Sequence, residues 1–136
     1  MKPSERFEQN IEPSFKEYVA EPKSQRRANI LATSLSNQSE WTFEFYKPGD
    51  PQLFGATSLK GFREEIIKRC PELKLMWDLA DADKHRFLTH PDPPRAVRVS
   101  TAAYIEQGDG LIIAGPNQPF LTAAETAMRF WKRWQD

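Results

Sequence analysis

The residues best suited to chemistry lie in one segment, Trp77 to Leu88, which combines acids, a histidine and two cations with helical periodicity. At about 100° per residue, Asp78 and His85 lie about 20° apart around a helix, and Asp81 lies about 40 to 60° from each of them. The three side chains therefore share one flank of the apolar stripe, while Asp83 points away. Because a carboxylate can orient an imidazole for proton transfer, the spacing indicates a candidate acid–base site.

The same residues allow three interpretations. In the catalytic one, His85 is a general acid or base, and Lys84 or Arg86 neutralises a phosphate. In the structural one, the imidazole donates a hydrogen bond to Asp81 or to an acid of another helix, such as Glu40. We favour this interpretation, since structural ion-pair networks perturb pKa values as often as catalytic sites do. The third is a carboxylate–histidine metal site, but only one such triplet exists, so we expect no metal.

His90 and Cys70 are the other residues with chemistry of their own. His90 either stabilises a helix C-terminus through the helix dipole, which we prefer, or joins Arg86 one turn earlier as part of a binding pair. Cys70 precedes Pro71 with no histidine beside it, so we expect a buried thiol rather than a nucleophile. As the single cysteine, it also excludes an internal disulfide.

Composition is that of an ordinary folded domain and argues against several classes of function. The chain has 136 residues, and its 19 Lys and Arg balance its 19 Asp and Glu. A zero net charge gives no overall positive field that attracts nucleic acid or anionic membranes, although it does not exclude a local basic patch. We find no membrane-length apolar run, secretory signal, or nucleotide-binding, zinc or hydrolase motif. We therefore expect one cytoplasmic domain spanning residues 1–136, with no membrane association and no cofactor.

Hydrophobic periodicity predicts a mainly α protein with a bundle of four to five helices. The first helix runs from Ser4, its N-cap, to Glu21, with a kink or a division into two short helices at Pro13 because proline lacks the amide that the helix ladder needs. The second runs from Ser24 to about Tyr46, with fraying expected around 33–39, and the third begins after Ser58.

The fourth predicted helix carries the candidate site. Pro71 lies in its first turn, and the helix ends before His90, which begins a proline-rich segment. The stripe that we expect to face the core consists of Leu73, Met76, Trp77, Ala80, Lys84, Phe87 and Leu88.

The pattern then changes to a period of two, in which Val97, Val99, Thr101, Ala103 and Ile105 form one alternating set. Gln107 to Gly110 is a turn signal, and Leu111 to Ala114 is the return strand. This predicts one inserted β-hairpin at about residues 96–114, lying across one end of the bundle. A C-terminal helix follows, with a capping box from Thr122 to Glu125 and a buried face of Ala123, Ala127, Phe130, Trp131 and Trp134.

The stretch from Asp78 to His85 resembles a group of small uncharacterised bacterial proteins that carry an Asp-x-x-Asn-x-x-Lys-His type motif late in a helical bundle. A Trp-bearing helix precedes their motif, as at Glu40-Trp41 here. They look broadly like HEPN-type helical domains, many of which act as RNases or nucleotide-modifying toxins, or assist such enzymes. The Asn of the motif is Asp81 in this chain, and Arg86-x3-His90 is one residue short of the Arg-x4-6-His signature of active HEPN nucleases. The resemblance implies a helical bundle more strongly than a nuclease.

Three hypotheses for function follow. We favour a protein-interaction or accessory module, which binds a protein partner or a second copy of the chain, with a structural Asp/His polar network. The alternative is a HEPN-like RNase or nucleotide-binding enzyme that uses His85, with Asp81 orienting it and Lys84 and Arg86 binding phosphate; nucleic acid is then the partner. The third is a binder of a small molecule or a metal within the bundle.

Overall fold

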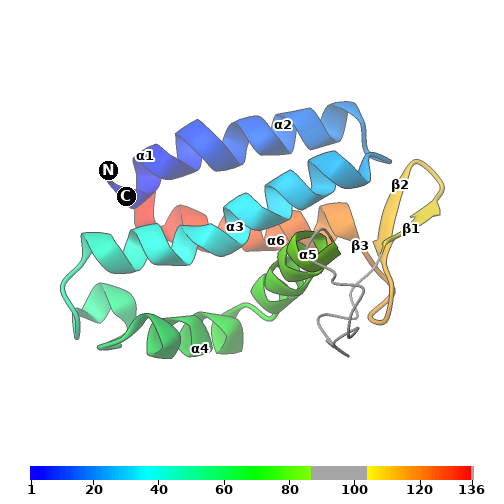
Figure 1. Ribbon diagram of the computed structural model, residues 1–136. Coiled ribbons are helices and arrows are strands. Elements are labelled where there is room, and N and C mark those ends of the chain that lie inside the picture. Colours follow the sequence, from blue (N-terminus) through cyan, green and yellow to red (C-terminus); the bar gives the residue numbers. More distant parts are fainter. Residues whose placement is uncertain (87–103, 136) are drawn as a thin grey trace.

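The computed structural model describes residues 1–86 and 104–135, with the backbone alone at 84–86 and 135. Within these residues the chain is mainly helical, with five helices and a three-stranded antiparallel sheet just before the C-terminal helix. The sheet lies at one end of the bundle, and α1 and η3 lie together at the opposite end (Figure 1). The predicted fold class is therefore confirmed. No helix among the described residues is both long and apolar enough to cross a membrane.

The first helix is continuous but contains one wide turn, because Pro13 lies near its middle. It consists of α1 (Pro3–Arg6), the π-helical turn η1 (Phe7–Ile11) and α2 (Glu12–Ala20). The Glu12 N–H bonds to the carbonyl of Phe7, five residues earlier. The predicted kink thus takes the form of a single π turn, the form in which π-helical geometry mostly occurs within α-helices. The predicted Ser4 N-cap is wrong, since the helix begins at Pro3, a residue suited to a first helical position.

The central helix α3 (Gln25–Phe45) begins at Ser24, whose side chain accepts a hydrogen bond from the Arg27 N–H as an N-cap. It packs against every other helix of the described chain. The predicted fraying around 33–39 is wrong. Hydroxyl groups there donate to carbonyls of their own helix, from Ser36 to Thr33 and from Ser39 to Ser36, so these polar side chains are satisfied without unwinding it.

Two shorter helices follow a loop that contains the 3-10 turn η2 (Pro51–Leu53). The helix α4 (Leu59–Arg69) begins directly after Ser58, as predicted, and the Ser58 hydroxyl accepts a hydrogen bond from the Gly61 N–H. The helix α5 (Glu72–Arg86) starts one residue after Pro71.

The core face of α5 differs from the predicted stripe. Leu73, Met76 and Leu79 are buried, whereas Trp77 and Ala80 are half-buried. The helix is therefore rotated toward Leu79, a residue that the predicted stripe leaves out. Phe87 and Leu88, the end of that stripe, lie outside the described residues.

The sheet has the order β1 (Tyr104–Gln107), β2 (Gly110–Ile113) and β3 (Gln118–Pro119). The hairpin predicted at 96–114 is confirmed from Tyr104 onward, and its first part lies outside the described residues. The third strand was not predicted; it pairs Ile112 with Pro119. Ile105, a member of the predicted alternating set, is 51 % exposed, and it is Tyr104 that turns toward the core.

The C-terminal helix α6 (Phe120–Trp131) continues into the 3-10 turn η3 (Lys132–Gln135). Its predicted capping box is wrong, because Pro119 is the N-cap residue and Thr122 already lies in the first turn. Trp131 and Trp134 are buried as predicted, while Phe130 is half-buried. The Trp131 Nε1–H donates to the Leu35 carbonyl of α3 at 3.0 Å, which fixes α6 against the central helix.

A hydrogen bond between side chains joins the sheet to the central helix. The Tyr104 hydroxyl donates to Asn29 Oδ1 at 2.6 Å, and Asn29 is 7 % exposed. Burial, and then the Asp83 carboxylate and Tyr18, raise the pKa of Tyr104, so its hydroxyl remains a donor in the folded state.

We predict that Tyr104→Phe lowers the free energy of unfolding by about 1–3 kcal/mol, because it leaves the buried Asn29 amide without its partner. Urea denaturation measures the change. The matched control is Tyr46→Phe, since Tyr46 is also half-buried but its hydroxyl makes no hydrogen bond with a described residue. Equal effects of the two variants would contradict the role given to the Tyr104–Asn29 bond.

Candidate functional site

The predicted site residues of α5 are only partly brought together. Asp78 accepts from Lys74 Nζ at 2.6 Å, in an ion pair one turn apart on the same helix. Asp81 lies one turn further on, and Lys84, His85 and Arg86 follow in the last turn, where the structure gives the backbone alone. His90 lies outside the described residues. The predicted role of His85 as an acid or base stays a prediction.

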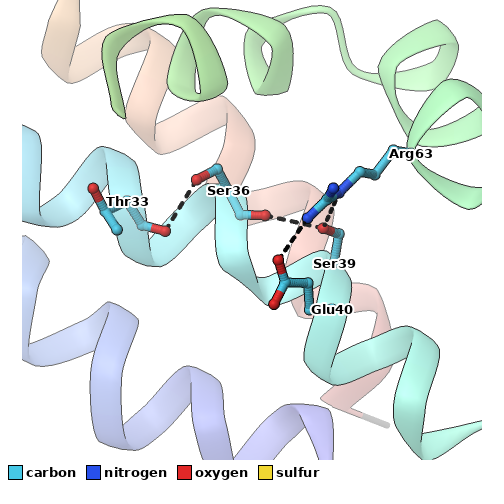
Figure 2. A network of polar contacts seen from close by, with 5 residues as sticks. All are labelled: Thr33, Ser36, Ser39, Glu40 and Arg63. Atoms are coloured by element: carbon cyan, nitrogen blue, oxygen red, sulfur yellow. Dashed lines mark hydrogen bonds and ion pairs between the residues drawn. The ribbon is translucent and has the colours of Figure 1, made fainter. Parts of the chain in front are cut away.

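Glu40 makes its contact with α4. Its carboxylate accepts from Arg63 Nη2 at 2.7 Å, and Arg63 Nε donates to Ser39 Oγ at 3.2 Å (Figure 2). The Arg63 guanidinium also lies 5.4 Å from the ring centre of Trp77 on α5. Arg63 therefore links three helices, α3, α4 and α5. Sequence patterns contain no signal for these contacts, because Arg63 lies on a different helix from all of its partners.

A second arginine lies near the same carboxylate and is buried. Arg6, only 6 % exposed, donates to Gln38 Oε1 at 2.8 Å and to the Ser34 carbonyl at 3.1 Å. Burial lowers the pKa of Arg6, and the negative charge of Glu40 opposes that shift. Glu40 is therefore the counter-charge for two arginines: it forms an ion pair with Arg63 and acts on Arg6 electrostatically, without a hydrogen bond.

A polar pocket of about 510 Å³ lies between α3 and α5 beside this network. Asp81 and Asp83 both line it. The remaining lining residues are Thr33, Ser36, Asn37, Arg63, Trp77 and Ala80.

The structure also bears on the alternative of a metal site and on the reactivity of Cys70. Within residues 1–86 and 104–135, no three histidine, cysteine or carboxylate side chains gather closely enough to hold a metal ion. Cys70 is buried, as predicted. Burial, and then the neighbouring Glu72 carboxylate, raise the pKa of the Cys70 thiol, which keeps it protonated and a poor nucleophile.

An apolar groove of about 400 Å³ lies at the other end of the bundle, beside the sheet. Three segments that are distant in the sequence build it: the end of α2 with Pro22, the β1–β2 hairpin, and the junction of β3 and α6. Val19 and Leu121 on its sides are 48 % and 38 % exposed. Its lining residues are Tyr18, Val19, Pro22, Gln107, Asp109, Gly110, Leu111, Ile112, Pro119 and Leu121.

A polar hollow of about 790 Å³ adjoins this groove, because Pro22 and Asp109 line both. Its other lining residues are Glu21, Lys23 and Ser24. The apolar groove was missed at the sequence level. Its residues come from separate elements, and nothing in their linear order shows that they meet.

Neither a family model, nor a curated protein, nor a solved structure matches this chain. The resemblance to HEPN-like domains, and the RNA-directed activity that it implies, therefore stay predictions.

We predict that Glu40→Gln lowers the free energy of unfolding by about 0.5 to 1 kcal/mol at low salt, because it removes the counter-charge for Arg63 and Arg6. The effect decreases at high salt, since both members of the Glu40–Arg63 pair are partly exposed.

Glu44→Gln is the matched control, since Glu44 is an exposed acid one turn further along α3 with no ion pair to a described residue. Thermal unfolding of both variants at two salt concentrations measures the difference. Indistinguishable melting temperatures would contradict the role of Glu40 as a shared counter-charge.

Proposed function

We propose that this chain is a protein-interaction module that binds a short apolar segment of a partner protein in the groove between α2, the hairpin and α6. The observation that carries the proposal is the groove itself. Scattered exposed apolar residues are ordinary on a protein surface, whereas apolar side chains gathered around a hollow are typical of binding sites. Here three separate elements supply them.

The size of the groove favours a short segment over a second copy of the chain. A stable dimer buries about 800 Å² on each partner, contributed by roughly 20–30 residues. The groove has ten lining residues and a volume of about 400 Å³, within the range of roughly 300–1,000 Å³ that is common for compact ligand pockets. A few apolar side chains of an extended or helical segment would fill it.

The sheet face beside the groove supports the same proposal. Ile105 and Ile112 are paired across β1 and β2, so their side chains lie on one face, and Ile112 also pairs with Pro119 of β3. Ile105 is exposed and Ile112 is half-buried. This apolar strip extends the groove surface, so a bound segment can bury more apolar area than the groove alone offers.

The polar network around Arg63 has a structural role in this proposal. Arg63 has bonded partners on α3 and lies over an aromatic ring of α5, an arrangement that fixes the relative positions of these helices. The network lies at a distance along the bundle from the sheet, and it shares no lining residue with the groove. It gives the rigid framework on which the groove is built.

The test is a selection of displayed random peptides against the full chain and two double variants. Val19→Ser with Leu121→Ser removes two apolar walls of the groove, and both residues are exposed enough for the fold to tolerate the change. We expect peptides enriched on the unmodified chain to bind this double variant at least about tenfold more weakly, which corresponds to roughly 1.4 kcal/mol of lost apolar contact.

The matched control is Ile30→Ser with Phe45→Ser, which removes two apolar side chains that are 40 % and 46 % exposed but do not line the groove. This variant should bind the peptides as the unmodified chain does, and circular dichroism checks that both variants fold. Failure to enrich peptides, or equal loss in both double variants, would contradict the proposal. A dimer in sedimentation that the groove variant dissociates would identify a second copy as the occupant instead.

A further inference from the structure

We propose that the segment bound in the groove carries a lysine or arginine next to its apolar residues, and that this cation pairs with Asp109. The inference rests on the proposed function, because it describes what occupies the groove. It assigns a specificity-determining residue to a surface that otherwise selects only for apolar character.

Asp109 occupies a distinctive place in this surface. Among the residues that the structure describes, it alone lines the apolar groove with a formal charge at neutral pH, and it also lines the adjoining polar hollow. Its side chain is exposed, and its carboxylate makes no hydrogen bond or ion pair with a described residue. A segment that leaves the apolar groove toward the hollow must therefore pass this carboxylate.

The turn holds Asp109 in a defined position. Gln107 pairs with Gly110, which leaves a two-residue loop of Gly108 and Asp109. Gly108 has a φ of +62°, the left-handed conformation that a type II′ hairpin turn places at its first position. At the base of the turn, a Cβ on Gly110 would lie 3.9 Å from both the Pro22 carbonyl and the Tyr18 hydroxyl, so the hairpin packs closely on the end of α2. The carboxylate is therefore presented by a constrained turn.

The other charges nearby favour a cation at this point. Glu21 in the polar hollow is paired with Arg27 at 3.3 Å, so its charge is already compensated. Lys23 lines the hollow but not the groove, whereas Asp109 lines both. A charged group bound where the groove joins the hollow therefore lies beside Asp109, with Lys23 only on the side of the hollow. An acid on the segment would lie closest to a carboxylate with the same charge.

The expected effect is modest because the carboxylate is exposed. A pair of exposed charges changes an affinity by roughly two- to fivefold, and salt screens it. The apolar contacts set most of the affinity, and Asp109 discriminates among apolar segments.

The probes are the tightest-binding peptides from the selection and synthetic copies in which each lysine or arginine is replaced by glutamine. Fluorescence anisotropy measures their binding to the unmodified chain, to Asp109→Asn and to Glu44→Gln, an exposed acid remote from the groove. We expect the cationic peptides to bind Asp109→Asn about two- to fivefold more weakly at low salt, with no difference at about 0.5 M salt. The glutamine copies should bind the chain and the Asp109→Asn variant equally, and Glu44→Gln should change nothing.

Two results would overturn this inference while leaving the proposed function in place. Enriched peptides without a basic residue would show that the groove selects apolar character alone. A loss at Asp109→Asn that is equal for the cationic peptides and their glutamine copies would assign Asp109 to the shape of the turn. Failure of the proposed function is distinguishable, because binding would then be insensitive to the Val19→Ser and Leu121→Ser pair.

Discussion

The structure depends on polar groups along the central helix α3, to which the surrounding elements attach one by one. Gln38 and the Ser34 carbonyl bind Arg6 of the first helix, and Gln38 Nε2 also donates to the Pro3 carbonyl. Asn29 binds Tyr104 of the sheet, the Leu35 carbonyl binds Trp131 of α6, and Ser39 with Glu40 binds Arg63 of α4. Apolar burial holds these elements together but does not determine how they are oriented. Each of these hydrogen bonds, in contrast, forms only when the two elements have one particular relative position.

This arrangement explains why a helix with so many polar residues lies at the centre. Asn29, Gln38 and Ser39 are almost fully buried. A buried polar group without a partner costs about 1–3 kcal/mol, so each becomes a strong constraint on the neighbour that satisfies it. The sheet is attached in this way through Asn29, and the groove is formed where the sheet meets the end of α2. The position of the groove therefore follows from the bonds made by α3.

Local signals in the sequence predicted the helices well and their ends unevenly. The starts of α3 at Ser24 and of α4 after Ser58 were predicted, and in the structure both serine side chains accept the hydrogen bond of an N-cap. Ser4 and Thr122 were assigned wrongly, because Pro3 and Pro119 start those helices earlier. The apolar pattern of α5 predicted the helix but not which of its faces is buried. Trp77 and Ala80 fit the helical spacing of apolar residues as well as Leu79 does, yet Leu79 is the buried one.

The candidate site was less accessible to prediction, because its contacts are between helices. Helical spacing predicts that Asp78, Asp81 and His85 share a flank, but nothing in the spacing indicates that Arg63 reaches Glu40 from α4. The apolar groove joins residues that are about a hundred positions apart in the chain, from Val19 to Leu121. Such a surface exists only after the sheet has been fixed against α2 and α6.

We propose that the groove beside the sheet is the binding surface of this protein. The most direct measurement is the change in backbone amide chemical shifts when the labelled chain is titrated with a selected peptide. We predict that the largest changes occur at Val19, Asp109 to Ile112 and Leu121, with little change at Arg63, Trp77 and Asp81. Changes concentrated at the pocket between α3 and α5 instead would contradict the account and would locate binding beside the Asp81 and Arg63 side chains.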